Sequence, residues 1–159
     1  MDSLLARLAD ETACLVSDAG MPGISDPGFR LVRACRENNI QITALPGPSA
    51  AITALAASGL PTDKFLFSGF LPKTEPKLTR IIQEAKTIEA TLVAYESPQR
   101  LQKTVQLIAN NFPDANIVVA RELTKLHEEY LRGTASEILD ILTQKPSIKG
   151  EITILISFK

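Results

Sequence analysis

The sequence contains little of several residue types, and each shortage excludes a class of protein. Only two of its 159 residues are cysteines, Cys14 and Cys35, and they match no metal-binding spacing. We therefore expect two reduced, buried thiols, with a disulfide or a zinc site as the alternatives. The formal net charge is only −1, so no overall basic field indicates a nucleic-acid partner. The 8 glycines and 10 prolines follow no period, which excludes a collagen-like or low-complexity chain.

Long hydrophobic runs are absent as well. The uncharged stretch 38–62 includes Asn38, Gln41, Pro46 and Gly59, so no continuous apolar helix can cross a bilayer there. The first residues are acidic and amphipathic, whereas a secretion signal is basic and then apolar. We expect a cytoplasmic protein with no membrane segment. Because 45% of the residues are hydrophobic, the chain can bury a sizeable core.

Strand-like and helix-like segments alternate along the chain, which predicts an α/β fold. In the first part the pattern predicts a helix ending near Asp10, buried parallel strands at 12–16 and 40–45, and helices at 27–38 and 50–58. The rest predicts strands at 64–70, 91–95, 116–120, 128–132 and 151–158, and helices at 75–86, 98–110 and 135–143. The last strand alternates in polarity, which is typical of a half-exposed antiparallel strand. We expect a partial parallel-sheet first domain in residues 1–61 and a mixed-sheet second domain in residues 62–159.

A loop rich in glycine and proline follows the first predicted strand, with the sequence Ser-Asp-Ala-Gly-Met-Pro-Gly at 17–23. Glycine lets a backbone approach a ligand closely, and proline stiffens the loop so that less chain entropy is lost on binding. The loop has no Walker A lysine, and its glycine spacing fails the dinucleotide fingerprint. Asp18 suits a ribose, amino or sulfonium group better than a pyrophosphate. A stiff connecting loop is the alternative.

A second loop, Leu-Pro-Gly-Pro-Ser at 45–49, follows the next predicted strand and begins a helix. The carboxyl ends of neighbouring parallel strands meet at one edge of a sheet. We therefore expect the free amides of this helix N-terminus to face the same crevice as Asp18. Small residues at Ser49 and Ala50 leave room there for a flat ring. A simple helix cap explains the segment equally well.

Two further motifs complete a set with a specific resemblance: Tyr-Glu-Ser-Pro-Gln-Arg at 95–100 and Arg-Glu-Leu-Thr-Lys at 121–125. With the two loops, they resemble the ribosomal RNA small subunit methyltransferase I family of the tetrapyrrole (corrin/porphyrin) methylase superfamily. The resemblance implies S-adenosylmethionine-dependent methylation of a cytidine ribose 2′-hydroxyl in small-subunit ribosomal RNA or the 30S particle. It also implies a two-domain homodimer with the methyl donor bound between the domains.

The same resemblance implies which residues contact the methyl donor: Asp18, Gly20, Ser49, Ala50, Ala120 and Gly150. Two positions depart from the family pattern, with Met21 in place of the usual threonine and Gln99 in place of the usual histidine. The family's first strand and its Pro-Ile-Gly-Asn loop have no counterpart here. We therefore expect an N-terminally truncated chain that begins about halfway through the first domain.

A sugar hydroxyl is a poor nucleophile, so a base or an electrostatic stabiliser would assist its methylation. Glu96, Glu122 and Lys125 are the candidate catalytic residues, because each follows a predicted strand within a family motif. Structural ion pairs with neighbouring arginines are the alternative roles of the two glutamates. His127 is the only histidine and could act as a base, or be an ordinary surface residue.

Contacts to RNA are expected to be electrostatic. Between residues 64 and 103 the chain has 7 basic and 4 acidic residues. From these we select four candidate RNA contacts: Lys73, Lys77, Arg80 and Arg100. A solvated helix face is the alternative, and no metal site is predicted. Two other functions stay open, a small-molecule methyltransferase of the tetrapyrrole type and a non-catalytic fragment of the methyltransferase.

Overall fold

The computed structural model describes residues 1–159, which form two compact units, Met1–Ser49 and Ala50–Lys159. The first unit contains two helices, α1 (Asp2–Leu8) and α2 (Phe29–Glu37). Both cysteines lie in this unit as free thiols, with Cys35 buried as expected and Cys14 exposed against expectation. No helix of either unit is long and apolar enough to span a membrane.

The two strands expected in the first unit are absent from the structure. Segments 12–16 and 40–45 form no regular secondary structure, and Val16 and Leu45 are 76% and 75% exposed. A strand needs neighbours that pair its backbone N–H and C=O groups, and this unit contains none. The predicted helix start at Pro27 is also wrong, since α2 begins after Gly28, whose φ is 139°.

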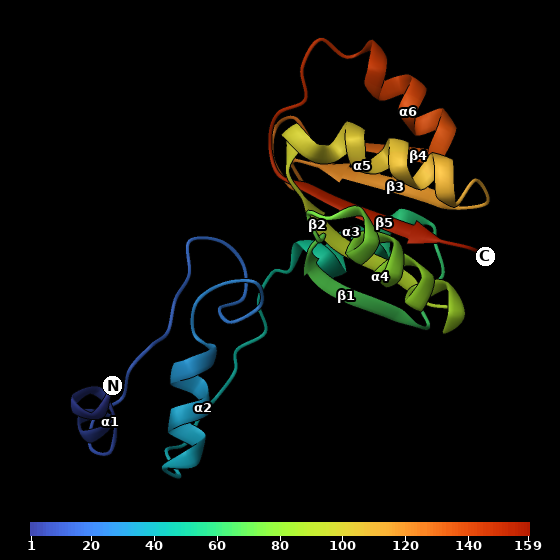
Figure 1. The fold of residues 1–159 in the computed structure, drawn as a ribbon. Helices are drawn as coiled ribbons and strands as arrows, with labels where there is room; N and C mark the ends of the chain where they lie inside the picture. Colours follow the sequence, from blue (N-terminus) through green and yellow to red (C-terminus); the bar gives the residue numbers. More distant parts are fainter. The chain divides into compact units, whose positions relative to one another are not determined.

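The second unit is built on one sheet, which confirms the predicted mixed-sheet α/β architecture (Figure 1). Its strands are β1 (Phe65–Phe70), β2 (Thr91–Glu96), β3 (Asn116–Arg121), β4 (Glu129–Thr134) and β5 (Ile152–Ser157). Their order across the sheet is β1-β2-β5-β3-β4. The β1–β2 pair is parallel, and every other neighbouring pair is antiparallel.

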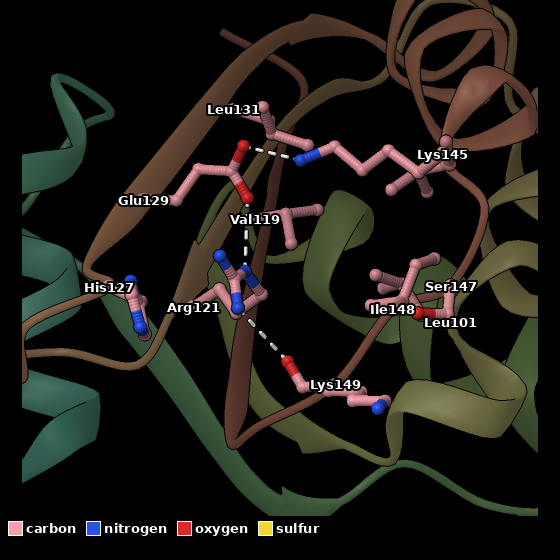
Figure 2. A pocket seen from close by; sticks show the side chains of 11 residues that line it. Leu101, Val119, Arg121, His127, Glu129, Leu131, Lys145, Ser147, Ile148 and Lys149 are labelled. Atoms are coloured by element: carbon pink, nitrogen blue, oxygen red, sulfur yellow. Dashed lines mark hydrogen bonds and ion pairs between the residues drawn. The ribbon is translucent and has the colours of Figure 1, made fainter.

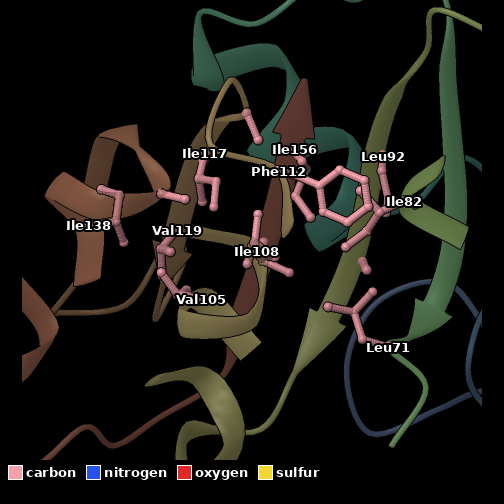
Figure 3. Packing of buried hydrophobic residues seen from close by; sticks show 14 of the residues in the cluster. Leu71, Ile82, Leu92, Val105, Ile108, Phe112, Ile117, Val119, Ile138 and Ile156 are labelled. Atoms are coloured by element: carbon pink, nitrogen blue, oxygen red, sulfur yellow. The ribbon is translucent and has the colours of Figure 1, made fainter. Parts of the chain in front are cut away.

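The two faces of the sheet bury different helices. One face packs against α4 (Glu75–Thr87), α5 (Pro98–Asn111) and α6 (Ala135–Gln144), and Figure 3 shows this larger core. The other face packs against α3 (Ala50–Ser58). Because side chains alternate along a strand, Ile154 of β5 belongs to the larger core and Leu155 to the α3 side. All six residues of β5 are buried, so the prediction of a half-exposed strand is wrong.

Helix α3 is anchored to the sheet of the second unit. The guanidinium of Arg132 donates from Nε to the Ser58 carbonyl (3.1 Å) and from Nη2 to the Ala57 carbonyl (2.8 Å). The Thr91 hydroxyl donates to the Pro61 carbonyl at 2.7 Å. Residues 50–61 therefore pack with the second unit. The domain boundary that we expect after residue 61 stays a prediction.

Candidate functional site

The two glycine- and proline-rich loops of the first unit lie side by side. The Met21 amide donates to the Pro48 carbonyl at 3.1 Å, and the Ser17 hydroxyl donates to the Gly20 carbonyl at 3.1 Å. Gly20 has a φ of 78°, and a Cβ added there would lie 3.1 Å from the Pro48 oxygen. The structure thus brings the two motifs together even though the strands expected before them are absent. The Asp18 side chain is exposed beside this contact.

Ala50 and Ala120, the next two predicted donor contacts, lie in the second unit. Ala50 is exposed as the first residue of α3. Ala120 is fully buried in β3, in the cluster that packs under α3. Ala120 is therefore a packing residue in this structure, and a role toward a methyl donor stays a prediction.

At the end of β3, the second unit assembles a group of charged residues. The Glu122 carboxylate accepts from the Glu151 amide at 2.9 Å and from the Lys125 ammonium at 3.0 Å. The same ammonium lies 3.0 Å from the Glu151 carboxylate. Glu122 has a φ of 51°, in the left-handed region. Such strain persists only where surrounding contacts hold it, and these three contacts provide that support.

The charges and hydrogen bonds of this group favour the ionised forms of Glu122 and Lys125. The Glu151 amide and then Lys125 hold the pKa of Glu122 below its ordinary value. The carboxylates of Glu151 and Glu122 raise the pKa of Lys125. At neutral pH the group therefore contains an anion that is a weak base and a cation that keeps its proton.

Gly150 faces the same group, beneath the side chain of Glu122. A Cβ on Gly150 would lie 2.6 Å from the Cγ, Cδ and Oε1 atoms of Glu122, closer than any van der Waals contact. Its φ is 95°, which also favours glycine. Glu122, from the motif at 121–125, and Gly150, implied by the family resemblance, therefore lie against each other.

Glu96 lies elsewhere in the unit, within a buried hydrogen-bond network. Its side chain is fully buried and accepts from the Ser97 amide and the Thr104 hydroxyl, each at 2.7 Å. The Arg100 guanidinium lies 3.2 Å from the same carboxylate and donates to the carbonyls of Leu71 and Pro72. The network connects the end of β2 to α5 and to the segment after β1. This geometry supports the alternative role of Glu96 as a structural ion-pair partner.

The remaining RNA candidates are exposed at the start of α4. Lys73 and Lys77 are exposed, and Arg80 pairs with Glu84 at 3.5 Å. Arg100 differs from them, because its guanidinium is engaged by the Glu96 network and only 27% exposed. The structure therefore separates three surface cations from one that is mainly structural.

A pocket of about 300 Å³ lies between β3, β4 and the segment that follows α6 (Figure 2). Its charged residues form a chain of contacts in which Glu129 bridges two cations. Arg121 Nε donates to Glu129 at 3.0 Å, and the Lys145 ammonium pairs with the other carboxylate oxygen. Arg121 also donates to the Lys149 carbonyl at 3.2 Å. His127 lines the pocket as well.

Sequence reasoning missed Glu129 and Lys145. The Arg121–Glu129 pair depends on hairpin register, since these two residues are direct cross-strand partners of β3 and β4. Aligning the two predicted strands as an antiparallel pair could have placed Arg121 opposite Glu129. Lys145 follows α6 in a loop, and no local pattern indicates its contact.

Glu129 is expected to make the stability of the second unit depend on pH. Lys145, and then Arg121, hold the pKa of Glu129 below its ordinary value. A carboxylate with a depressed folded pKa stabilises the fold above its unfolded pKa, and this contribution is lost as the pH falls through the folded pKa. Urea denaturation at about pH 6 and about pH 3 should therefore show a smaller acid-induced loss for Glu129→Gln than for the unchanged chain. An equal loss in both proteins would contradict this assignment.

With this geometry in place, comparison with known proteins identifies the family. Residues 2–139 match the family model of the Tetrapyrrole (Corrin/Porphyrin) Methylases. The chain belongs to this family. Among solved structures, the methyltransferase CobJ covers 98% of this methylase chain with a TM-score of 0.68 and 18% identity, over 69% of its own length. Uroporphyrin-III C-methyl transferase from Thermus thermophilus, complexed with S-adenyl homocysteine, covers 97% with a TM-score of 0.57 and 14% identity, over 70% of its length. These likenesses show the methylase fold.

Sequence relatives of this methylase chain are closer. It is 46% identical over 149 residues to a protein of Hydrogenobaculum sp. (strain Y04AAS1) named "Ribosomal RNA small subunit methyltransferase I", covering 93% of the chain and 64% of that relative. It is 44% identical over 155 residues to a protein of the same name from Halalkalibacterium halodurans, covering 94% of the chain and 53% of that relative. The chain therefore spans between half and two thirds of the length of these relatives.

Proposed function

We propose that this methylase chain is part of an S-adenosylmethionine-dependent methyltransferase that acts on the 2′-hydroxyl of a cytidine ribose in small-subunit ribosomal RNA. The observation that carries the proposal is the 46% identity over 93% of the chain to a relative named for this class of substrate. The four motifs that suggested the same family lie within the matched region of the family model. We further propose that the protein works in the cytoplasm as a homodimer on the 30S particle.

The loops of the first unit suit the methyl donor. The Asp18 carboxylate is exposed and makes no hydrogen bond within the chain, so its oxygens are available to ribose hydroxyls or to an amino group. The contact between Met21 and Pro48 fixes the neighbouring backbone, which reduces the entropy lost on binding. We propose donor contacts at Asp18, Gly20, Ser49 and Ala50, with Gly150 and Ala120 contributing from the second unit.

S-adenosylmethionine, when bound, supplies a methyl group on a sulfonium sulfur as the electrophile. The chain's own residues would orient the ribose oxygen and stabilise the charge that develops on it. Lys125 suits the second task, because its side chain is 46% exposed and its pKa is raised. Glu122 suits a positioning role, since its contacts hold Lys125 and the Gly150 turn. Glu96 is too deeply buried to meet a substrate and supports α5 instead.

RNA binding is proposed for the exposed cations at the start of α4. Lys73 and Lys77 enter no ion pair, so their ammonium groups are available to phosphate groups. Arg80 of α4 adds a third exposed cation. Arg100 would contribute only through the quarter of its side chain that is exposed.

The reaction can be tested by methyl transfer. With tritiated S-adenosylmethionine, small subunits that lack this methyl group should acquire label in their RNA. Label found only in a porphyrinoid would replace the proposal with the tetrapyrrole-type function. A folded chain that binds no S-adenosylmethionine in calorimetry would support the non-catalytic fragment.

Replacement of Asp18 by alanine is expected to weaken donor binding about tenfold or more, the effect of losing one hydrogen bond to a charged group. The change removes an exposed side chain, so the unfolding midpoint should stay the same. Isothermal titration with S-adenosylmethionine measures the affinity. Asp10→Ala is the matched control, because Asp10 is an exposed aspartate of the same unit outside both loops. Equal affinities in the two variants would refute the role of Asp18.

A further inference from the structure

The pocket of the second unit combines apolar walls with a charged rim (Figure 2). Leu131 of β4 and Ile148, which follows α6, are partly buried and supply aliphatic surface above the core residues Val119 and Leu142. The volume of about 300 Å³ is at the lower end of the range for small-ligand sites. None of the residues proposed to contact the methyl donor lines this pocket. It is therefore a separate cavity that the reaction described above does not use.

The rim of the pocket has an excess of positive charge. Arg121, Lys145 and Lys149 line it, and Glu129 is its only carboxylate. Glu129 occupies the position between two of these cations, where it pairs with Arg121 and Lys145 at once. All three of these side chains are only 25% to 29% exposed, so solvent screens their charges incompletely. A ligand anion that reached this position would meet the same two cations as Glu129.

We propose that this pocket binds one nucleotide of the RNA substrate, with the base between the aliphatic walls and the phosphate between Arg121 and Lys145. The inference rests on the proposed function, which makes a single-stranded RNA segment the partner. Proteins commonly bind such segments by taking unstacked bases into pockets and by stacking them on arginine planes. Glu129 then acts as an internal counterion, which holds the two cations in place and competes with the phosphate.

Because Glu129 competes with the phosphate and Lys145 binds it, substitution of these two ion-pair partners should change nucleotide affinity in opposite directions. Glu129→Gln removes the competing anion, so affinity for the nucleotide should rise about fivefold. Lys145→Gln removes a phosphate partner and leaves Glu129 on Arg121, so affinity should fall by about fivefold or more. Both substitutions break the same Lys145–Glu129 contact. A purely structural ion pair would change stability in both variants without moving affinity in opposite directions.

The experiment titrates the full chain with three probes: inorganic phosphate, cytidine 5′-monophosphate and a short single-stranded oligoribonucleotide. We expect cytidine monophosphate to bind more tightly than phosphate, because the walls bury the base, and the oligoribonucleotide to show the same opposite shifts. Asp140→Asn is the control, since Asp140 is an exposed acidic residue of α6 that does not line the pocket. It changes the net charge as Glu129→Gln does and should leave affinity unchanged.

Three results would overturn the inference: equal binding of phosphate and cytidine monophosphate, shifts of the same sign in the two variants, or binding of the free nucleotide but not of the oligoribonucleotide. Failure of the proposed reaction is distinguishable from these. A chain that transfers no methyl group, but binds the oligoribonucleotide with opposite shifts in the two variants, refutes the reaction and supports the pocket.

Discussion

Replacement of Glu96 by alanine is expected to lower the free energy of unfolding by about 3 kcal/mol, since it breaks a buried network. The Glu96 side chain has no exposed surface. Its removal leaves the Thr104 hydroxyl and the Ser97 amide without their acceptor and the Arg100 guanidinium without its counterion. Water does not reach these buried groups to replace the lost hydrogen bonds, so the loss lowers the stability of the fold.

Urea denaturation followed by circular dichroism measures this loss. Glu96→Gln keeps the shape of the side chain and one of its two acceptor oxygens, so it should cost less than the alanine variant. Glu89→Ala is the surface control, because Glu89 is 72% exposed and pairs only with Lys159 at 3.1 Å. The surface pair should contribute at most about 1 kcal/mol. If Glu96→Ala cost no more than Glu89→Ala, Glu96 would not be the structural centre that its contacts indicate.

Local patterns predicted the second unit well because they agree with its packing. Pro98 follows Ser97 at the start of α5, a position that suits proline, and the helix begins there. Thr134 begins α6 through a complete capping box with Glu137. In each case the local signal and the tertiary contacts favour the same boundary. This agreement between local signal and packing makes a helix or strand predictable from the sequence alone.

The first unit shows the limit of the same reasoning. Segment 12–16 is as apolar as much of β2, yet only β2 forms a strand, because β1 and β5 pair with its two edges. Whether a segment forms a strand depends on neighbouring strands that pair with it, and the sequence of the segment itself does not specify those neighbours. Phe65 and Phe70 show a related limit: both are large apolar residues, yet they are 43% and 63% exposed because β1 is an edge strand.

The candidate site was predictable to a similar extent. The Glu96–Arg100 pair is four residues apart across the start of a predicted helix, so sequence spacing indicated it. The contact of Lys125 with Glu151 joins segments that are separated by β4 and α6, and only the folded sheet brings them together. Spacing along the chain therefore predicts local pairs, whereas register and topology determine the rest.

Replacement of Gly150 by alanine is the second change with a large expected effect, a loss of about 2 to 3 kcal/mol in the free energy of unfolding. Two costs combine. An alanine at a φ of 95° is strained by about 1 to 2 kcal/mol. In addition, its Cβ would lie 2.6 Å from three atoms of Glu122, so the carboxylate must leave the Glu151 amide and Lys125. Under the proposed function, methyl transfer should fall as well, since Lys125 loses one of the two anions that position it.

The two costs can be separated with glycines of the same chain. Gly59 has a φ of 82°, and a Cβ there meets no atom within 4 Å, so Gly59→Ala reports backbone strain alone. Gly150→Ala should cost more than Gly59→Ala by the value of the Glu122 contacts. In a Glu122→Ala background the collision is gone, and Gly150→Ala should then cost no more than Gly59→Ala. An equal cost of Gly150→Ala in both backgrounds would show that the Glu122 side chain does not require glycine at position 150.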